Sequence, residues 1–283
     1  MKKKVLITGG SGLLAVNWAL SIRDEYEVTL LLHQRKIYLK GVKTDIANIS
    51  SLDECKAVLD RHKPDVVIHT AGLTSVEKCE ENPNLAQEVN VDLAKNIAIA
   101  CDKQNVKLVH ISTDHLFSGE GSFVTEESNA TPINNYAKTK LEGERQVQKN
   151  CKDALIIRTN FFCWGTKYRQ SFSDFIISKL RNNESIDLFS DVFFTTILAE
   201  ELAQKVHQLI DAKASGVFNV VGSECMSKYE FGVKLANCFG LDANLINEIS
   251  INDKPNLVKR PKDMSLSNKK ICKTLNCKMP SID

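Results

Sequence analysis

The N-terminal residues carry a short apolar strand, a glycine-rich turn and a helix in direct succession. Residues Lys4–Thr8 predict a buried strand, and the turn Thr8-Gly9-Gly10-Ser11-Gly12 leads straight into a helix expected over residues 12–22. Gly9 permits the tight turn, and Gly12 allows an anionic pyrophosphate to approach the backbone closely. The free N–H groups and the positive dipole end of the helix then attract that anion. This pattern favours a dinucleotide-binding α/β fold over an ordinary strand–turn–helix connection, which is the alternative for a glycine-rich turn taken alone.

Strands and helices continue to alternate after this first unit. Further strands are predicted over Glu27–Leu32, Asp65–His69, Val106–Ser112, Ala154–Thr159 and Gly216–Val221, and helices over Ser51–His62, Asn84–Asn105, Ser171–Arg181, Leu198–Ile210 and Lys228–Phe239. Another helix is expected to begin with Thr131 as its N-cap and Pro132 in its first turn, and to run to about Lys149. Such alternation predicts a doubly wound parallel sheet with helices on both faces.

The second half of the chain is less regular, and the tail Lys254–Asp283 is polar and turn-rich. No repeat or clean linker divides the sequence. We therefore predict a single domain over residues 1–283. Its smaller, irregular C-terminal substrate-binding lobe is expected to be built mainly from residues 160–190 and 223–283.

The composition limits the class of protein. The 283 residues are 43% hydrophobic and 25% charged, the ordinary mixture of a soluble chain that can bury a core. No apolar run approaches the roughly 20 residues of a membrane-spanning helix, and the apolar stretch after MKKK is too short for a secretory signal, so a cytoplasmic protein without a membrane partner is expected. Mixed charges with a net of +2 do not suggest a nucleic-acid partner. Nine cysteines without a CxxC pair predict reduced, mostly buried thiols rather than a metal site or a disulfide framework.

The end of the second strand indicates the type of cofactor. An NAD-binding protein usually places Asp or Glu there, on the ribose 2′-OH. This strand ends Leu32-His33-Gln34-Arg35-Lys36 without an acid, and Arg35, with His33 or Lys36 beside it, can hold a 2′-phosphate instead. The alternative is a solvent-exposed basic turn. The pattern favours NADP(H) over NAD(H).

Two further patterns point to proton transfer. Tyr136 and Lys140 stand at i and i+4 of a predicted helix and therefore share a face. A neighbouring ammonium is expected to lower the pKa of the phenol, which is near ~10 when unperturbed. The strand that ends Ser112-Thr113-Asp114-His115 places hydroxyl groups at the carboxyl edge of the sheet, where ligands bind in such folds. A YxxxK pair alone is common, but the order of glycine turn, hydroxyl-bearing strand and YxxxK helix favours a catalytic site.

These motifs and the segments around them resemble the extended short-chain dehydrogenase/reductases, and most closely the dTDP-4-dehydrorhamnose reductase (RmlD-like) family. The resemblance rests on KPDVVIHTAGLTSVEKCEENPNLAQEVNV (63–91), HISTDHLFSGEG (110–121), TPINNYAKTKLEGE (131–144) and LIIRTNFFCWG (155–165), with looser matches over 216–232 and 259–270. It implies a Rossmann-type fold and an NAD(P)H-dependent oxidoreductase that reduces a nucleotide-activated 4-keto-6-deoxy sugar, as in deoxysugar and polysaccharide biosynthesis. The nucleotide sugar is the implied partner, and a homodimer is compatible with the resemblance.

The resemblance also assigns roles to residues at matching positions. It implies hydride transfer to C4 with Thr113, Tyr136 and Lys140 as the catalytic residues, Tyr136 as the proton donor and Lys140 also on the cofactor ribose. The expected cofactor-binding residues are Gly9, Ser11, Gly12, Leu13, Leu14, His33, Arg35, Asp45, Ile46, Thr70, Ala71, Gly72, Tyr136 and Lys140. The expected substrate-binding residues are Thr74, Val76, Thr113, Asp114, His115, Phe161 and Arg260. Asn90 matches an asparagine that braces the central helix in relatives, and no metal ligand is assigned.

Some positions depart from the family pattern and keep other functions open. His115 stands where a Tyr is usual and Phe161 where a Trp is usual, which bears on the identity of the sugar rather than on the fold. A nucleotide-sugar epimerase or dehydratase with tightly held NAD would share the three catalytic residues. It would favour an acid after the second strand, however, and a dehydratase would favour Glu in place of His115. A third possibility is a non-catalytic NADP-binding regulatory subunit that resembles the beta subunit of methionine adenosyltransferase, although the intact catalytic residues argue weakly against it.

Overall fold

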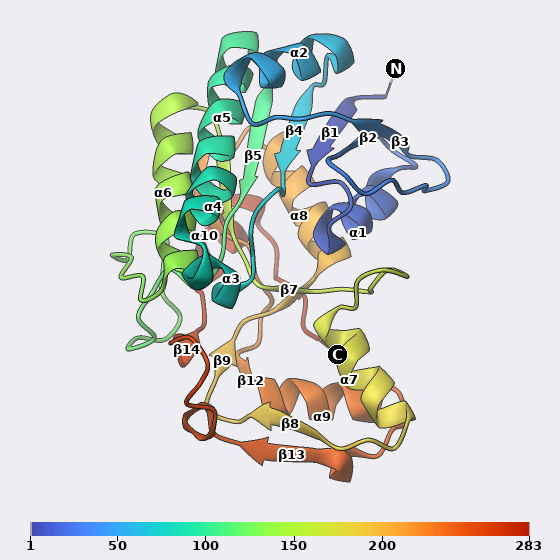
Figure 1. Ribbon diagram of the computed structural model, residues 1–283, viewed down its shortest axis with the longest axis vertical. Coiled ribbons are helices and arrows are strands. Elements are labelled where there is room, and N and C mark those ends of the chain that lie inside the picture. The colour runs from blue at the N-terminus through green and yellow to red at the C-terminus, as the bar shows by residue number, and fades with distance from the viewer. Residues whose placement is uncertain (1, 283) are drawn as a thin grey trace.

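The computed structural model describes residues 2–282 and has two lobes, one above the other in Figure 1. The larger lobe is built on a seven-stranded sheet in the order β11-β6-β5-β4-β1-β2-β3, and its neighbouring strands are parallel. The strands are β1 (Lys4–Thr8), β2 (Glu27–Leu32), β3 (Lys43–Ile46), β4 (Val66–His69), β5 (Lys107–Ile111), β6 (Leu155–Arg158) and β11 (Gly216–Asn219). The parallel sheet predicted from the alternation of strands and helices is confirmed.

Helices cover both faces of the sheet, and successive side chains of β1 belong to different cores. Val5 and Ile7 pack in a core with α1 (Leu13–Ile22), α8 (Ala199–Asp211) and α10 (Lys269–Leu275). Leu6 packs on the other face with α2 (Leu52–His62), α5 (Leu93–Gln104) and α6 (Asn135–Asn150). Burial on both faces explains why these strands read as continuous apolar runs rather than as an alternation of apolar and polar residues.

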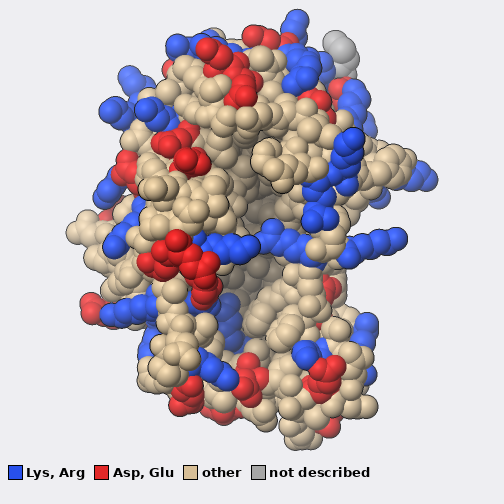
Figure 2. Space-filling model, viewed as in Figure 1, with Lys and Arg blue, Asp and Glu red and all other residues tan. Residues whose placement is uncertain are grey.

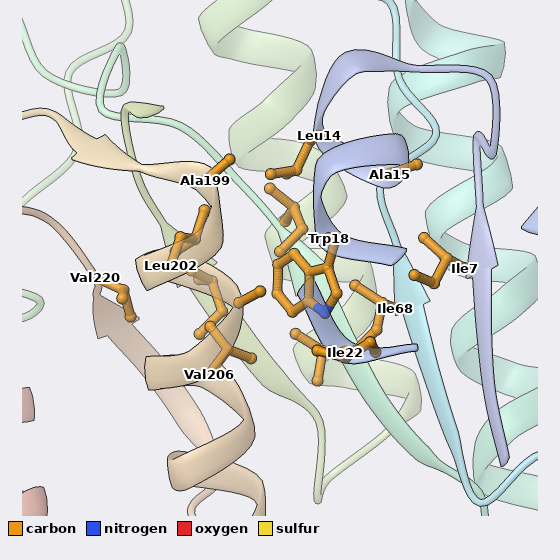
Figure 3. Close-up of a cluster of buried hydrophobic side chains, with 14 of the residues drawn as sticks. Ile7, Leu14, Ala15, Trp18, Ile22, Ile68, Ala199, Leu202, Val206 and Val220 are labelled. Atoms are coloured by element: carbon orange, nitrogen blue, oxygen red, sulfur yellow. The ribbon is translucent and has the colours of Figure 1, made fainter. Parts of the chain in front are cut away.

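Trp18 of α1 anchors the first of these cores. Figure 3 shows its ring among the side chains of Leu14, Leu202 and Val206, so that α1 and α8 meet around it. The side chain is completely buried, and its Nε1 donates a hydrogen bond to His207 Nε2 at 3.2 Å. The indole N–H therefore has a partner although no water reaches it, as buried tryptophans require. This packing holds the N-terminus of α1, and with it the glycine-rich turn, in a fixed position on the sheet.

The helix predicted over Asn84–Asn105 is interrupted. The chain runs as α4 (Pro83–Gln87), a π-helical turn η1 (Glu88–Asp92) and then α5. The apolar residues in this stretch are spaced as in one continuous α-helix. Their spacing therefore does not reveal the extra residue in the π-helical turn. This turn carries Asn90. It brings the Asn90 backbone so close to α6 that there is no room for a side chain at Gly143. π-helical turns of this kind occur frequently at functional sites.

The start of α6 also differs from the prediction. Its N-cap is Asn134, whose side chain accepts a hydrogen bond from Ala137 N at 2.9 Å, rather than Thr131. The Thr131 hydroxyl accepts from Ser118 N at 3.0 Å instead, and Thr131 N donates to Leu116 O at 2.9 Å. Thr131 therefore ties together the loop that follows β5, and the helix begins after that loop has turned.

The smaller lobe contains α7 (Phe172–Arg181), α9 (Lys228–Cys238) and several short strands. The remaining elements of the chain are α3 (Val76–Glu81), β7 (Phe161–Phe162), β8 (Ile186–Phe189), β9 (Phe193–Phe194), β10 (Ile197–Leu198), β12 (Met226–Ser227), η2 (Ala243–Leu245), β13 (Ile246–Ile249), η3 (Ile251–Asp253) and β14 (Asp263–Met264). Strand β8 pairs with β13 in parallel, and β9 lies between β12 and β14. Phe194, Phe231 and Ile246 belong to a separate core of this lobe.

Three of these elements have no clear signal in the sequence. Strand β3 is an edge strand whose side chains are mostly exposed, so its sequence KTDI lacks an apolar run. Strand β13 and helix α10 are short, and α10 lies in the tail that was expected to be turn-rich. Ile271 of α10 is nevertheless fully buried against the sheet. Within residues 2–282, no helix is both long and apolar enough to span a membrane.

The contact between η1 and α6 makes a specific prediction about stability. A Cβ atom at Gly143 would lie 2.4 Å from the Asn90 carbonyl oxygen, a backbone atom that cannot move freely. Gly to Ala in a helix normally stabilises a protein, but here we expect Gly143→Ala to lower the free energy of unfolding by about 1–3 kcal/mol. Urea denaturation measures the change, with Gly121→Ala as the control because a Cβ there would meet only Val124 at 3.8 Å. An unfolding midpoint for Gly143→Ala at or above that of the native protein would contradict the close contact.

Candidate active site

A cavity of about 600 Å³ lies at the carboxyl ends of β1, β4, β5 and β6. Figure 2 shows a hollow in the middle of one face of the molecule, with Lys and Arg side chains across it. Most of the site residues predicted from the sequence line the cavity: Gly9, Ser11, Gly12, Leu13, Leu14, Arg35, Thr70, Ala71, Gly72, Thr74, Val76, Thr113, Asp114, His115, Tyr136, Lys140 and Phe161. The structure therefore brings together residues from the N-terminal turn and the start of α1, from the segments that follow β2, β4, β5 and β6, and from helices α3 and α6.

The glycine-rich turn forms one wall of this cavity. Gly9 has a φ of +65°, and a Cβ there would lie 2.8 Å from Ala71 Cα, so both the backbone conformation and the space require glycine. A Cβ at Gly12 would lie 3.0 Å from Gly9 O. Helix α1 follows without a side-chain cap and without an acidic residue in its first turn. The N–H groups that begin the helix remain available to an anion in the cavity.

The loop after β4 forms the next part of the wall, and Asn90 holds it in place. Asn90 Oδ1 accepts a hydrogen bond from Leu73 N at 2.8 Å, and its Nδ2 donates to Leu73 O at 3.1 Å. The same Nδ2 group donates to Thr139 Oγ1 of α6 at 3.1 Å. The buried amide therefore links the loop to the helix that carries Tyr136 and Lys140. This contact is the structural counterpart of the bracing role that the resemblance implied for Asn90.

Tyr136, Thr113 and Lys140 meet at the opposite wall. Tyr136 is buried, and its hydroxyl forms a hydrogen bond with the side chain of Thr113. Lys140 Nζ donates to the Ile111 carbonyl oxygen at 2.6 Å. Burial lowers the pKa of Lys140 to about 8. The three side chains lie in the same cavity although they come from a strand end and a helix.

One expectation about Tyr136 is wrong. The sequence predicted that the Lys140 ammonium lowers the pKa of the phenol. In the structure burial raises the pKa of Tyr136 above its ordinary value, and the hydrogen bond with Thr113 opposes this effect only in part. The Lys140 amine is bound to a main-chain carbonyl instead. Tyr136 is therefore a protonated phenol at neutral pH.

Asp114 and His115 extend the cavity beyond Thr113. Asp114 is buried, and its Oδ2 accepts a hydrogen bond from Asn160 Nδ2 at 2.6 Å while its Oδ1 accepts from Thr113 Oγ1 at 3.2 Å. The His115 ring lies edge-on to the Tyr136 ring, with 5.5 Å between the ring centres. Burial lowers the pKa of His115, so the imidazole is neutral near pH 7. Asp114 thus orients the hydroxyl of Thr113 and the amide of Asn160 in the cavity.

Arg35 lies at the mouth of the cavity together with a residue that the sequence did not single out. This second residue is Tyr168, and the guanidinium carbon of Arg35 is 4.6 Å from the centre of its ring. The Tyr168 hydroxyl donates to Ser11 O at 3.0 Å, so the segment after β7 closes over the glycine-rich turn. Tyr168 and Arg169 both line the cavity. Nothing in the local sequence indicates this, because the contact joins segments far apart in the chain.

Four predicted residues lie outside the lining of the cavity. Asp45 accepts hydrogen bonds from α2, through His62 Nε2 at 2.7 Å, and lies 3.2 Å from Arg61 Nη2. His33 and Ile46 are exposed. Arg260 forms an ion pair with Glu77 of α3. Roles of these four residues toward a ligand stay predictions, and Asp45 and Arg260 already have partners within the protein.

Comparisons with known proteins agree with the fold and the site. The model of the RmlD substrate binding domain family matches residues 2–282. A probable low-salt glycan biosynthesis reductase, Agl14 of Haloferax volcanii, is 29% identical over 98% of this chain and 94% of its own length. Methionine adenosyltransferase 2 subunit beta of Pongo abelii is 27% identical over 95% of this chain and 81% of its own length.

A solved structure shows the same architecture. The dTDP-4-dehydrorhamnose reductase of Bacillus anthracis in complex with NADP superposes with a TM-score of 0.88, at 25% identity, over 99% of this chain and 96% of that chain. The fold class and the resemblance identified in the sequence are thereby confirmed. Two of these three relatives are named reductases, in agreement with the predicted oxidoreductase class. Because its model matches almost the whole sequence, the chain belongs to the RmlD substrate binding domain family.

Proposed function

We propose that this protein is an NAD(P)H-dependent reductase of a nucleotide-activated 4-keto-6-deoxy sugar, similar to dTDP-4-dehydrorhamnose reductase. The observation that carries the proposal is the meeting of Thr113, Tyr136 and Lys140 across one cavity from the glycine-rich turn and the uncapped start of α1. The reductases among the relatives support the same reaction class. The structure of one such reductase with NADP supports the cofactor class.

The shape and donors of the cavity fit a dinucleotide cofactor. The turn at Gly9 and Gly12 leaves no room for a Cβ atom without a close contact, and it brings backbone to the cavity surface beside the start of α1. Leu13 and Leu14 begin that helix and would present their N–H groups to the pyrophosphate. Thr70, Ala71 and Gly72 would lie along the cofactor, and Lys140 would hold its ribose.

The residues opposite the glycine-rich turn would bind the sugar carbonyl and give it a proton. When bound, the reduced nicotinamide supplies a hydride, which we assign to C4 of the sugar. The Thr113 hydroxyl has one hydrogen, which it gives to Asp114 in the structure, and it would turn this hydrogen to the C4 oxygen as negative charge develops there. The Tyr136 hydroxyl then gives its proton to that oxygen. A phenol, whose ordinary pKa is about 10, carries its proton at neutral pH, and this is the form that a general acid needs.

The sugar would lie against the residues at the far end of the cavity. Thr74 and Val76 follow the loop that Asn90 braces, and Phe161 and His115 line the side toward the smaller lobe. A neutral imidazole offers one donor and one acceptor to sugar hydroxyls. We assign these four residues and Asp114 to the substrate side, and Arg260 to a position near the nucleotide.

The cofactor preference rests on Arg35, which lines the cavity where an NAD-binding protein usually has an acid. We expect NADPH to bind more tightly than NADH. Arg35→Ala should weaken the binding of NADPH by roughly 10- to 100-fold, because charge-assisted hydrogen bonds to its 2′-phosphate would be lost. NADH affinity should change little. Fluorescence titration of both cofactors measures the effect, with Lys40→Ala as the control for loss of an exposed charge. A native protein that prefers NADH would contradict the assignment.

The relative that is a subunit of methionine adenosyltransferase supports a second candidate, a cofactor-binding regulatory subunit without turnover. Both candidates would bind the cofactor at the same site, but only the reductase would convert a nucleotide sugar. An epimerase or dehydratase with tightly held NAD is the less favoured enzyme, because Arg35 occupies the mouth of the cavity and His115 follows Asp114. A panel of 4-keto nucleotide sugars with NADPH and NADH, with products identified by NMR, separates these functions. Oxidation of the cofactor with formation of a 4-hydroxy sugar is the expected result.

A further inference from the structure

The segment between β7 and α7, residues 164–170, reaches the mouth of the cavity, and we call it the strap. Figure 1 shows it between the two lobes, below α1. Near its start, Asn17 Nδ2 of α1 donates a hydrogen bond to Trp164 O at 2.9 Å. After its end, Ser171 caps α7, since its hydroxyl accepts from Asp174 N at 3.1 Å. The strap is therefore held by the larger lobe at one end and by the smaller lobe at the other.

A tight turn in the strap carries Tyr168. Thr166 N donates to Arg169 O at 2.8 Å, and Arg169 N donates back to Thr166 O at 3.3 Å. The Thr166 hydroxyl also accepts from Arg169 N at 3.1 Å. A Cβ atom at Gly165 would lie 2.9 Å from Arg169 O, so the base of the turn is closely packed. The position of Tyr168 is therefore set by the strap itself, before any ligand binds.

Tyr168 contacts two parts of the cavity wall at once. Its hydroxyl donates to Ser11 O at 3.0 Å, and the guanidinium carbon of Arg35 lies 4.6 Å from the centre of its ring. Ser11 belongs to the glycine-rich turn, where the cofactor pyrophosphate is expected, and Arg35 follows β2, where the 2′-phosphate is expected. One side chain of the strap thus connects the two segments that would hold the phosphates of the cofactor.

The ring of Tyr168 is the contact that holds the Arg35 side chain. Arg35 is exposed, and within residues 2–282 its guanidinium makes no hydrogen bond and no ion pair. A long exposed side chain of this kind otherwise samples many rotamers and loses that freedom when it binds a ligand. Contact with an aromatic ring restricts it and takes up no hydrogen-bond acceptor. The N–H donors of Arg35 therefore stay available for phosphate oxygens.

We infer that Tyr168 is a positioning residue that fixes the Arg35 guanidinium for the 2′-phosphate of NADP(H). The inference rests on the cofactor preference proposed above. An arginine that already lies against the ring loses less side-chain freedom when it binds the phosphate. NADH carries a hydroxyl in place of this phosphate, so its affinity should not depend on the contact. Tyr168 would thereby contribute to the choice between the two cofactors, although it lies far from β2 in the chain.

Fluorescence titration of the protein with NADPH and with NADH tests this role. Tyr168→Leu should weaken NADPH binding by roughly 3- to 10-fold, the cost of ordering one long side chain on binding, and should change NADH binding little. Tyr168→Phe keeps the ring and loses only the hydrogen bond to Ser11, so it should retain most of the preference for NADPH. Tyr38→Leu is the control, because Tyr38 is an exposed tyrosine of the same segment as Arg35.

A double-mutant cycle with Arg35→Ala separates positioning from a structural role. In the Arg35→Ala protein no guanidinium is left to position, so adding Tyr168→Leu should cause no further loss of NADPH affinity. Losses that add in the double variant would mean that Tyr168 acts independently of Arg35, and the inference would be rejected.

The remaining outcomes also decide the matter. Equal losses of NADPH and NADH affinity in Tyr168→Leu would make the strap a general cover over the glycine-rich turn. Tighter binding of both cofactors would show that Tyr168 occupies their place and has to leave it. Either result contradicts positioning, while a selective effect of Arg35→Ala on NADPH would leave the proposed cofactor preference intact. A native protein that prefers NADH would overturn both.

Discussion

Replacing Tyr136 by Phe should reduce turnover by roughly 10²–10⁴-fold, the usual contribution of a positioned general acid. The change removes one hydroxyl from a buried ring, so the packing against His115 and the fold should persist. NADPH should still bind with close to native affinity, because Lys140 and the glycine-rich turn are unchanged. Stopped-flow oxidation of NADPH with a 4-keto nucleotide sugar measures the rate, and fluorescence titration measures cofactor affinity.

A matched control for this variant is Tyr26→Phe. Tyr26 also contacts a histidine, with 4.5 Å between its ring centre and that of His207, but it is not part of the cavity lining. Its loss of a hydroxyl should leave turnover unchanged. If Tyr136→Phe kept native activity, the proton would have to come from another group, and the mechanism would be rejected. Loss of activity together with loss of NADPH binding would point to damaged packing rather than to acid catalysis.

Gly12→Val should weaken NADPH binding by about 100-fold or more, which is about 2.8 kcal/mol at 1.4 kcal/mol per tenfold change. A Cβ at this position would lie 3.0 Å from Gly9 O, and a branched side chain would extend further into the space where the pyrophosphate is expected. The start of α1 would then be shielded from the anion. Isothermal titration calorimetry gives the affinity, and circular dichroism shows whether the fold is retained.

Gly121→Val provides the control for this second variant. Gly121 lies in an exposed part of the loop after β5, and a Cβ there would make only an ordinary contact with Val124 at 3.8 Å. It should bind NADPH as the native protein does. Unchanged NADPH affinity in a folded Gly12→Val protein would mean that the turn is structural only, and the cofactor would then have to be placed elsewhere.

The sequence could predict the parts of the site that depend on residues close together in the chain or on the order of the strands and helices. The turn from Gly9 to Gly12 follows a strand and opens a helix, so its place at the carboxyl edge of the sheet is set by the order of elements. Tyr136 and Lys140 share a helix face because they are four residues apart. Thr113 follows β5, the strand next to β4 and β6, and reaches the same edge.

The remaining features depend on contacts between distant segments. Tyr168 reaches Ser11 only because the segment after β7 folds back over the glycine-rich turn. The raised pKa of Tyr136 is a consequence of burial, which the spacing of Tyr136 and Lys140 does not reveal. Asp45 was assigned to the cofactor by resemblance alone, and its carboxylate binds α2 in the structure.

The most direct test of the account is transfer of deuterium from the C4 position of labelled NADPH to a 4-keto nucleotide sugar. The native protein should oxidise the labelled cofactor, and NMR should find the deuterium on C4 of a 4-hydroxy product in a one-to-one ratio with the cofactor consumed. The Tyr136→Phe protein should give the same product far more slowly. Tight NADPH binding with no deuterium transferred to any nucleotide sugar in the panel would contradict the reductase and favour a regulatory subunit.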